Sequence, residues 1–237
     1  GANIPALTDG RRDLVLTATD AAGNPATSAN VSFVINLDNN LTVGAGKDFA
    51  TIQAAVNAAT SGNTISIDSG DYSEDVIIDG KDLTLTGVGG VATALSFTLT
   101  NTTVSGSTNV GAPVINVNPG AKIQDGVLLA LGSTVNVAAG TYDEQVVIDK
   151  VLTLQGAGND TVIRPSQTTA DGFQLFNRKA GGPSNTAGII VTKAGASDSI
   201  TVKNLKVDGS LVSSLPGGAD FLAGVLYRGS GGLIDSV

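Results

Sequence analysis

Two Tyr–x–Glu pairs stand at equivalent places in two similar segments of the 237-residue chain. The first lies in GDYSEDVIIDGK, residues 70–81, and the second in GTYDEQVVIDK, residues 140–150. Two neighbouring carboxyl groups can cleave a glycosidic bond, one as an acid and the other as a base or nucleophile. Glu144 with Asp143 or Asp149 is therefore a candidate for chemistry on a carbohydrate.

The same segments also fit a purely structural role. Both copies keep the tyrosine and the glutamate, but Ser73 corresponds to Asp143 and Asp75 corresponds to Gln145. A catalytic pair built on these neighbours would be lost in one of the two copies, and most surface carboxylates are simply solvated. We therefore favour a framework in which the tyrosines pack at a corner of the fold and the glutamates accept hydrogen bonds from turn backbone. No catalytic residue is assigned.

Composition excludes several kinds of chemistry. The chain has no Cys, His, Met or Trp, which rules out disulfides, thiolate chemistry and a Ser-His-Asp triad within it. Its net charge of −8 argues against nucleic acid, whose phosphates need a basic surface. The sequence contains no apolar run long enough to span a bilayer, so membrane insertion is not expected. The many carboxylates do permit Ca²⁺.

Three aspartates are candidate calcium ligands, and no other cofactor is predicted. Asp160 lies in GAGNDTVI, which fits most positions of a calcium-binding nonapeptide, but such sites form between tandem copies and only one is present. Asp20 and Asn24 lie in TATDAAGN, a stretch that resembles tandem Ig-like repeats. Such repeats sometimes hold Ca²⁺ near domain junctions, and this resemblance implies Asp38 as a further ligand. Ca²⁺ needs six or more oxygen ligands, so we favour an ordinary turn at Asp160 and an Asx turn at Asp20.

Residues 1–40 carry the pattern of a β-hairpin. Alternating runs at residues 11–19 and 29–37 flank the turn sequence DAAGNPA. The stretch TATDAAGNPATSANVSFVI resembles the last two strands of bacterial Ig-like repeats, which occur in tandem in surface proteins and adhesins. A complete Ig-like sandwich needs about 100 residues, so the resemblance implies the end of a domain. We expect the chain to be a fragment of a longer protein.

A different pattern follows the hairpin. Apolar spacing predicts a short amphipathic helix over about residues 49–60, with Asp48 as its N-cap and Gly62 as its stop. From Thr64 onward, short β runs recur and end at Gly, Asn or Asp, which is typical of an all-β repeat architecture. A β-sandwich is the main rival fold, but it explains neither the helix nor its repetition.

The helix and its strands occur twice. Residues 51–89 align with residues 122–158 through matching Ile, Gln, Val, Gly, Tyr, Glu and Leu positions, which predicts a second short helix near residues 122–130. We place a first capped unit at residues 41–110 and a second at 111–237, and expect the second to continue beyond the fragment. The pattern leaves open whether the two units form one continuous structure.

Four strings carry a family resemblance: F-x-T-I-Q-x-A-V, G-N-T-I-x-I, G-x-Y-x-E-x-V-x-I and L-T-L-x-G. They are similar to the opening of right-handed parallel β-helix proteins, including pectin methylesterases and the broader pectin-lyase-like superfamily. The resemblance covers residues 45–90 and 121–160, and implies an all-β, right-handed parallel β-helix whose first coil is capped by the helix. In the resembled esterases this segment is structural, and the GNVDFIFG-type motif that carries a catalytic Asp is absent here.

These observations favour a non-enzymatic, extracellular protein of the bacterial cell surface with a structural or adhesive role. The expected partners are polysaccharide or other surface protein subunits, including copies of the chain itself. Two alternatives stay open. One is a carbohydrate-active enzyme resembling a pectin esterase or a polysaccharide lyase, and the other is a glycan-binding module without catalysis.

Overall fold

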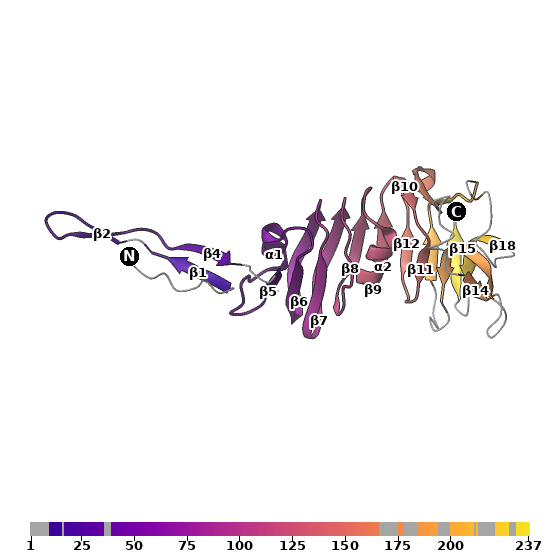
Figure 1. Ribbon diagram of the computed structural model, residues 1–237. Coiled ribbons are helices and arrows are strands. Elements are labelled where there is room, and N and C mark those ends of the chain that lie inside the picture. The colour runs from indigo at the N-terminus through magenta and orange to yellow at the C-terminus, as the bar shows by residue number, and fades with distance from the viewer. Residues whose placement is uncertain are drawn as a thin grey trace.

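The computed structural model describes residues 10–15, 17–35, 39–165, 175–177, 184–193, 200–210, 212, 221–227 and 231–237. In this part of the chain, a narrow antiparallel hairpin leads into an elongated stack of parallel β coils (Figure 1). Two short helices lie against the stack, one near its start and one near its middle (Figure 1).

The predicted N-terminal hairpin is confirmed. Strand β1 (Gly10–Leu14) pairs antiparallel with β4 (Val31–Ile35), and β2 (Thr17–Thr19) pairs antiparallel with β3 (Pro25–Thr27). The hairpin extends from one end of the stack (Figure 1).

The stack is a parallel β-helix, as the sequence predicts. Its strands are β5 (Asn40–Val43), β6 (Thr64–Asp79), β7 (Thr84–Thr100), β8 (Val110–Val117), β9 (Ala130–Val137), β10 (Gly140–Asp143), β11 (Val146–Ile148), β12 (Thr153–Gln155), β13 (Thr161–Arg164), β14 (Leu175–Asn177), β15 (Ser184–Thr192), β16 (Ile200–Lys203), β17 (Lys206–Val207), β18 (Phe221–Tyr227) and β19 (Gly232–Asp235). Within the described residues, the largest sheet runs β5-β6-β7-β8-β9-β12-β16-β19, with every neighbouring pair parallel. Strand β8 pairs with β7 on one side and β9 on the other, so a single sheet runs through both repeated units.

The two smaller sheets of the stack are also mainly parallel. One is ordered β10-β13-β17, and the other joins β11, β15 and β18, with β14 antiparallel to β15. A parallel crossover connection is usually right-handed, which is the hand that the family resemblance implies.

Strand alternation builds the core. One column of buried side chains passes through successive coils in register: Val76, Phe97, Ile115, Val135, Leu154 and Val202. On each strand, the residues directly before and after the column residue point outward, because successive side chains of a strand point to opposite faces. Each coil therefore adds one layer to a continuous apolar column, while the outer face carries polar residues together with some exposed apolar ones such as Ile77 and Leu95.

Both predicted helices exist, but the first starts later than predicted. Helix α1 spans Ile52–Ala58 and α2 spans Ile123–Leu129. The N-cap of α1 is Thr51, whose Oγ1 accepts a hydrogen bond from Ala54 N at 3.2 Å. Phe49 precedes the helix in extended backbone and is only partly buried, bridging to a residue of β5.

The prediction of Asp48 as the N-cap is wrong. Its Oδ2 accepts hydrogen bonds from Thr42 N at 3.1 Å and from Thr42 Oγ1 at 2.7 Å. These bonds tie the loop before α1 back to β5. Asp and Thr are both common N-caps, so this tertiary contact decides between them.

Gly87 and Gly156 are equivalent glycines that lie where another segment of backbone crosses. A Cβ atom on Gly87 would clash with the carbonyl oxygen of Asn109, and one on Gly156 would clash with that of Asn204. Both asparagines adopt the left-handed conformation, with φ of 54° and 53°. The repeated glycine therefore gives room for the tight corner of the neighbouring coil.

Replacing Gly87 by Ala is expected to lower the free energy of unfolding by roughly 1–3 kcal/mol, because a backbone carbonyl must move to make room. The measurement is the urea midpoint compared with that of Gly231→Ala, where an added Cβ meets open space. A urea midpoint for Gly87→Ala equal to that of the wild-type protein would contradict the close approach of the Asn109 backbone to Gly87.

Candidate functional site

Glu74 binds the start of α1. Its Oε1 accepts a hydrogen bond from Ile52 N at 2.7 Å, and its Oε2 accepts one from Gln53 N at 2.9 Å. The first N–H groups of a helix have no partner inside the helix, and the positive end of the helix dipole favours an anion there. The sequence predicted that Glu74 accepts hydrogen bonds from the backbone of a turn. In the structure it accepts them from the N-terminus of α1 instead.

Glu144 repeats this arrangement at α2. Its Oε1 accepts from Ile123 N at 2.7 Å and its Oε2 accepts from Gln124 N at 3.0 Å. Burial raises the pKa of Glu144, and the two N–H bonds partly oppose that shift. The charge of Asp125 also raises this pKa, to a smaller extent. Both oxygens of each repeated glutamate are thus occupied by a helix.

Each helix also carries a glutamine whose side-chain amide bonds to the backbone N–H and C=O of one strand residue, as the backbone of a neighbouring strand would. Gln53 Oε1 accepts from Ile77 N at 2.6 Å, and its Nε2 donates to Ile77 O at 3.1 Å. Gln124 makes the same two bonds with Val147, at 2.8 and 3.1 Å. The side-chain amides cover the backbone edge of β6 and of β11, which would otherwise be open to pairing with another strand.

Two equivalent lysines hold the other ends of the helices. Lys81 Nζ donates to Val56 O at 2.7 Å and to Asn57 O at 3.0 Å. Lys150 Nζ donates to carbonyl oxygens at the end of α2, at 3.1 and 3.2 Å. A cation at a helix C-terminus satisfies carbonyls that lack a partner within the helix. The role of these lysines was not predicted from the sequence, although both end the repeated segments.

The two tyrosines lie at corners of the coils. Tyr142 is buried, and its hydroxyl donates to Ala138 O at 3.1 Å and is 3.3 Å from Val117 O. The Tyr72 hydroxyl donates to Asp68 O at 2.8 Å. Burial raises the pKa of Tyr142 to about 12, with a smaller contribution from the charge of Glu144. Each ring therefore closes a corner through backbone contacts.

The raised pKa of Tyr142 predicts a loss of stability at alkaline pH. The folded protein holds the phenol proton more tightly than the unfolded chain, so the stabilisation is complete below pH 10.0 and is lost as the pH rises towards about 12. The expected loss is on the order of 2 kcal/mol. Urea midpoints measured across this range should fall less steeply for Tyr142→Phe than for the wild-type protein, and parallel slopes would contradict the assignment.

The two acids that could have acted with Glu144 have different surroundings. Asp143 Oδ1 lies 2.7 Å from Nε of Arg164 on the next coil, and this contact raises the pKa of the Arg164 guanidinium. Asp149 is exposed at the end of the repeated segment. Both oxygens of Glu144 are therefore bonded to α2, and Asp143 is paired with Arg164.

Of the three candidate calcium ligands, Asp160 and Asp20 lie in different elements of the described chain. Asp160 is exposed at the end of a short 3₁₀ helix, Gly158–Asp160. Asp20 Oδ1 accepts from Ala22 N and Asn24 N at 2.8 and 2.9 Å, and bonds with Asn24 chiefly lower the pKa of Asp20. Asp38 lies outside the described residues. In the part of the chain that the structure describes, no three His, Cys, Asp or Glu residues are grouped so that they could hold a metal ion.

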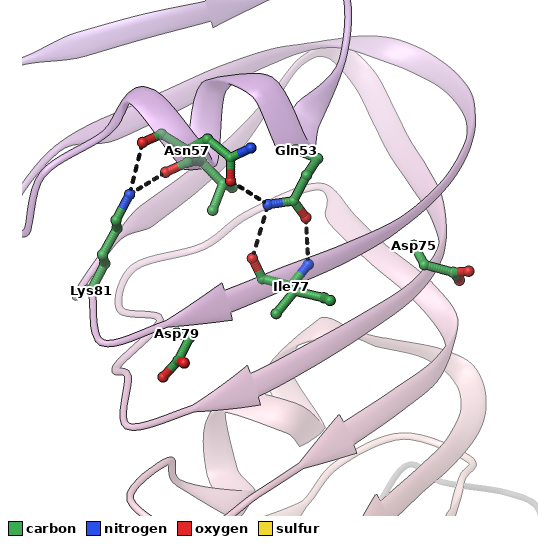
Figure 2. Close-up of a pocket in the computed structure, with 7 residues that line it drawn as sticks. Gln53, Asn57, Asp75, Ile77, Asp79 and Lys81 are labelled. Atoms are coloured by element: carbon green, nitrogen blue, oxygen red, sulfur yellow. Dashed lines mark hydrogen bonds between the residues drawn. The ribbon is translucent and has the colours of Figure 1, made fainter.

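A groove of about 470 Å³ lies between α1 and β6. Figure 2 shows Gln53 and Asn57 on its helix side and Asp75, Ile77 and Asp79 along the strand. This groove was not predicted from the sequence. The alternation of Asp75, Ile77 and Asp79 was a visible signal that all three share one face, but only the position of α1 makes that face the wall of a groove.

These contacts define a parallel β-helix in which two helices are each held by a glutamate, a glutamine and a lysine. Neither models of protein families, nor curated proteins, nor solved structures give a match to this chain. Among the helices that the structure describes, none combines the length and apolar character needed to cross a membrane.

Proposed function

We propose that this chain is a non-enzymatic structural or adhesive element of an extracellular bacterial surface protein. One observation supports this most strongly: Glu74 and Glu144, the carboxylates of the repeated motif, use both of their oxygens to hold helices. Their role in the framework accounts for their repetition without any chemistry on a substrate. The finer assignments, a pectin-lyase-like helix and an Ig-like hairpin, belong to the same proposal.

The continuous sheet supports a role as a rigid rod. Parallel coils stack at about 4.8 Å per strand, and each coil buries its apolar face against its neighbours. Outward side chains also bond from coil to coil. Asn136 Nδ2 donates to Asn116 Oδ1 at 3.1 Å, and Asn116 Nδ2 lies 3.3 Å from Thr98 Oγ1. A stiff polar face of this kind suits contact with a glycan or with another surface subunit.

The test compares turnover with binding. The protein is incubated with pectin and with alginate, with and without Ca²⁺, while methanol release and the absorbance of unsaturated products are followed. We expect no product above the buffer control, together with binding on an array of bacterial and plant glycans. A pectin esterase and an alginate lyase serve as positive controls. Turnover would overturn the proposal in favour of a carbohydrate-active enzyme.

A further inference from the structure

In the part of the chain that the structure describes, the groove between α1 and β6 is a candidate ligand site. Its volume of about 470 Å³ falls within the range of sites for small molecules. Asp75, Ile77 and Asp79 alternate along β6 and share its outer face, with Ile77 55% exposed. Figure 2 shows these three residues spread along the strand below the helix that carries Gln53 and Asn57, with Ile77 nearest to Gln53.

Some polar groups of the groove are already engaged. Gln53 Nε2 donates to Asn57 Oδ1 at 2.8 Å and to Ile77 O, while Gln53 Oε1 accepts from Ile77 N (Figure 2). Lys81 Nζ donates to two carbonyl oxygens at the end of α1. Gln53 and Lys81 therefore build the wall, and the positive charge of Lys81 faces the negative end of the helix dipole.

Other groups are left for a ligand. The Asp79 carboxylate makes no hydrogen bond or ion pair with any described residue, and Asp75 uses Oδ1 alone, accepting from Ser96 Oγ at 2.6 Å. The Asn57 amide nitrogen can still donate, since its bond to Gln53 uses the oxygen. The two carboxylates lie four residues apart on one strand, which separates them by about 13 Å with the apolar Ile77 surface between them.

The second unit shows which of these residues the framework requires. Helix α2 keeps the glutamine and the lysine as Gln124 and Lys150, but the position of Asn57 is taken by Leu128 and that of Asp75 by Gln145. Gln145 Nε2 donates to the backbone of β15 instead. Helix α2 keeps its glutamate, glutamine and lysine contacts without counterparts of Asp75 and Asn57, so those contacts do not require these two residues.

We infer that the groove binds an uncharged, hydroxyl-rich sugar. Sugar hydroxyls donate to Asp75 and Asp79, the Asn57 amide donates to a ring or hydroxyl oxygen, and a C–H face of the sugar packs on Ile77. Hydrogen bonds to an ionised acceptor are stronger than those between neutral groups. The groove lining carries two carboxylates against the single cation of Lys81, so its net negative charge disfavours a uronic-acid chain such as pectate or alginate. This inference rests on the proposed function and names the ligand class of its glycan contact.

The test uses the whole chain on an array of cello- and manno-oligosaccharides, oligogalacturonate and chitosan oligomers. The wild-type protein should bind a neutral oligosaccharide and not oligogalacturonate. Asp75→Ala and Asp79→Ala should each weaken that binding by about tenfold or more, as expected for lost hydrogen bonds to a charged group. Asp149→Ala, at the position equivalent to Asp79 in the second unit, should leave it unchanged.

Three outcomes would overturn the groove assignment: no binding of neutral sugars, binding only of oligogalacturonate or of chitosan oligomers, or neutral-sugar binding that survives both substitutions at Asp75 and Asp79. In the last case a glycan contact lies elsewhere on the rod, so the proposed function stands while the groove does not. Turnover of a polysaccharide would instead overturn the proposed function. Urea midpoints of both variants should match that of the wild-type protein, because both side chains are exposed.

Discussion

Replacing Phe97 by Ala is expected to lower the free energy of unfolding by about 3–5 kcal/mol. Phe97 is among the largest fully buried side chains, with 0% exposure. It lies in register between Val76 of β6 and Ile115 of β8, at the centre of the stacked column. Removing its ring leaves a cavity that the neighbouring coils cannot fill without moving, because each is bonded to strands on both sides. The measurement is the free energy of unfolding from urea titration.

Leu95 provides the matched control on the same strand. It precedes Phe97 by two residues and is 53% exposed. Leu95→Ala should change the free energy of unfolding by less than about 0.5 kcal/mol, as is usual for a surface position. Equal losses for Phe97→Ala and Leu95→Ala would mean that the inward column is placed wrongly.

Replacing Glu144 by Ala is expected to cost roughly 2–4 kcal/mol, because it leaves the N–H groups of Ile123 and Gln124 without their acceptors. These groups begin α2, which lies against β8, β9 and β11. Helix α2 is therefore partway along the stack and not at one of its ends. The neighbouring variant Asp143→Asn is the control, since Asp143 and Arg164 form an exposed pair. Its urea midpoint should stay close to that of the wild-type protein, and a larger loss for Asp143→Asn than for Glu144→Ala would reverse the roles assigned to the two acids.

The sequence predicts the fold because its signals are local and repeated. Strand alternation, glycines at corners and the duplicated helix pattern each persist over several coils, and together they identify the parallel β-helix. The choice between Asp48 and Thr51 as N-cap could not be made in this way, because both residue types suit the position. A contact between Asp48 and Thr42, which belongs to another element, settles it.

The roles within the site were harder to predict for the same physical reason. Gln53 binds Ile77, which lies 24 residues further along the chain, so its role depends on how one coil lies against the next. The repetition of Gln53 as Gln124 identifies both as important but does not reveal their partners. The groove was harder still to predict from the sequence, because Asp75 and Asp79 become its wall only once α1 has been placed beside β6.

The central claim is that the repeated glutamates hold helices rather than act on a substrate. Amide hydrogen exchange of Ile123 and Gln124 in the wild-type protein and in Glu144→Ala tests this most directly, under conditions where both proteins are folded. We predict that both amides exchange faster in the variant, while the amides of Ile115 and Val135 in the flanking strands change much less, as for a local opening of the helix start. Unchanged exchange at Ile123 and Gln124 would contradict the claim.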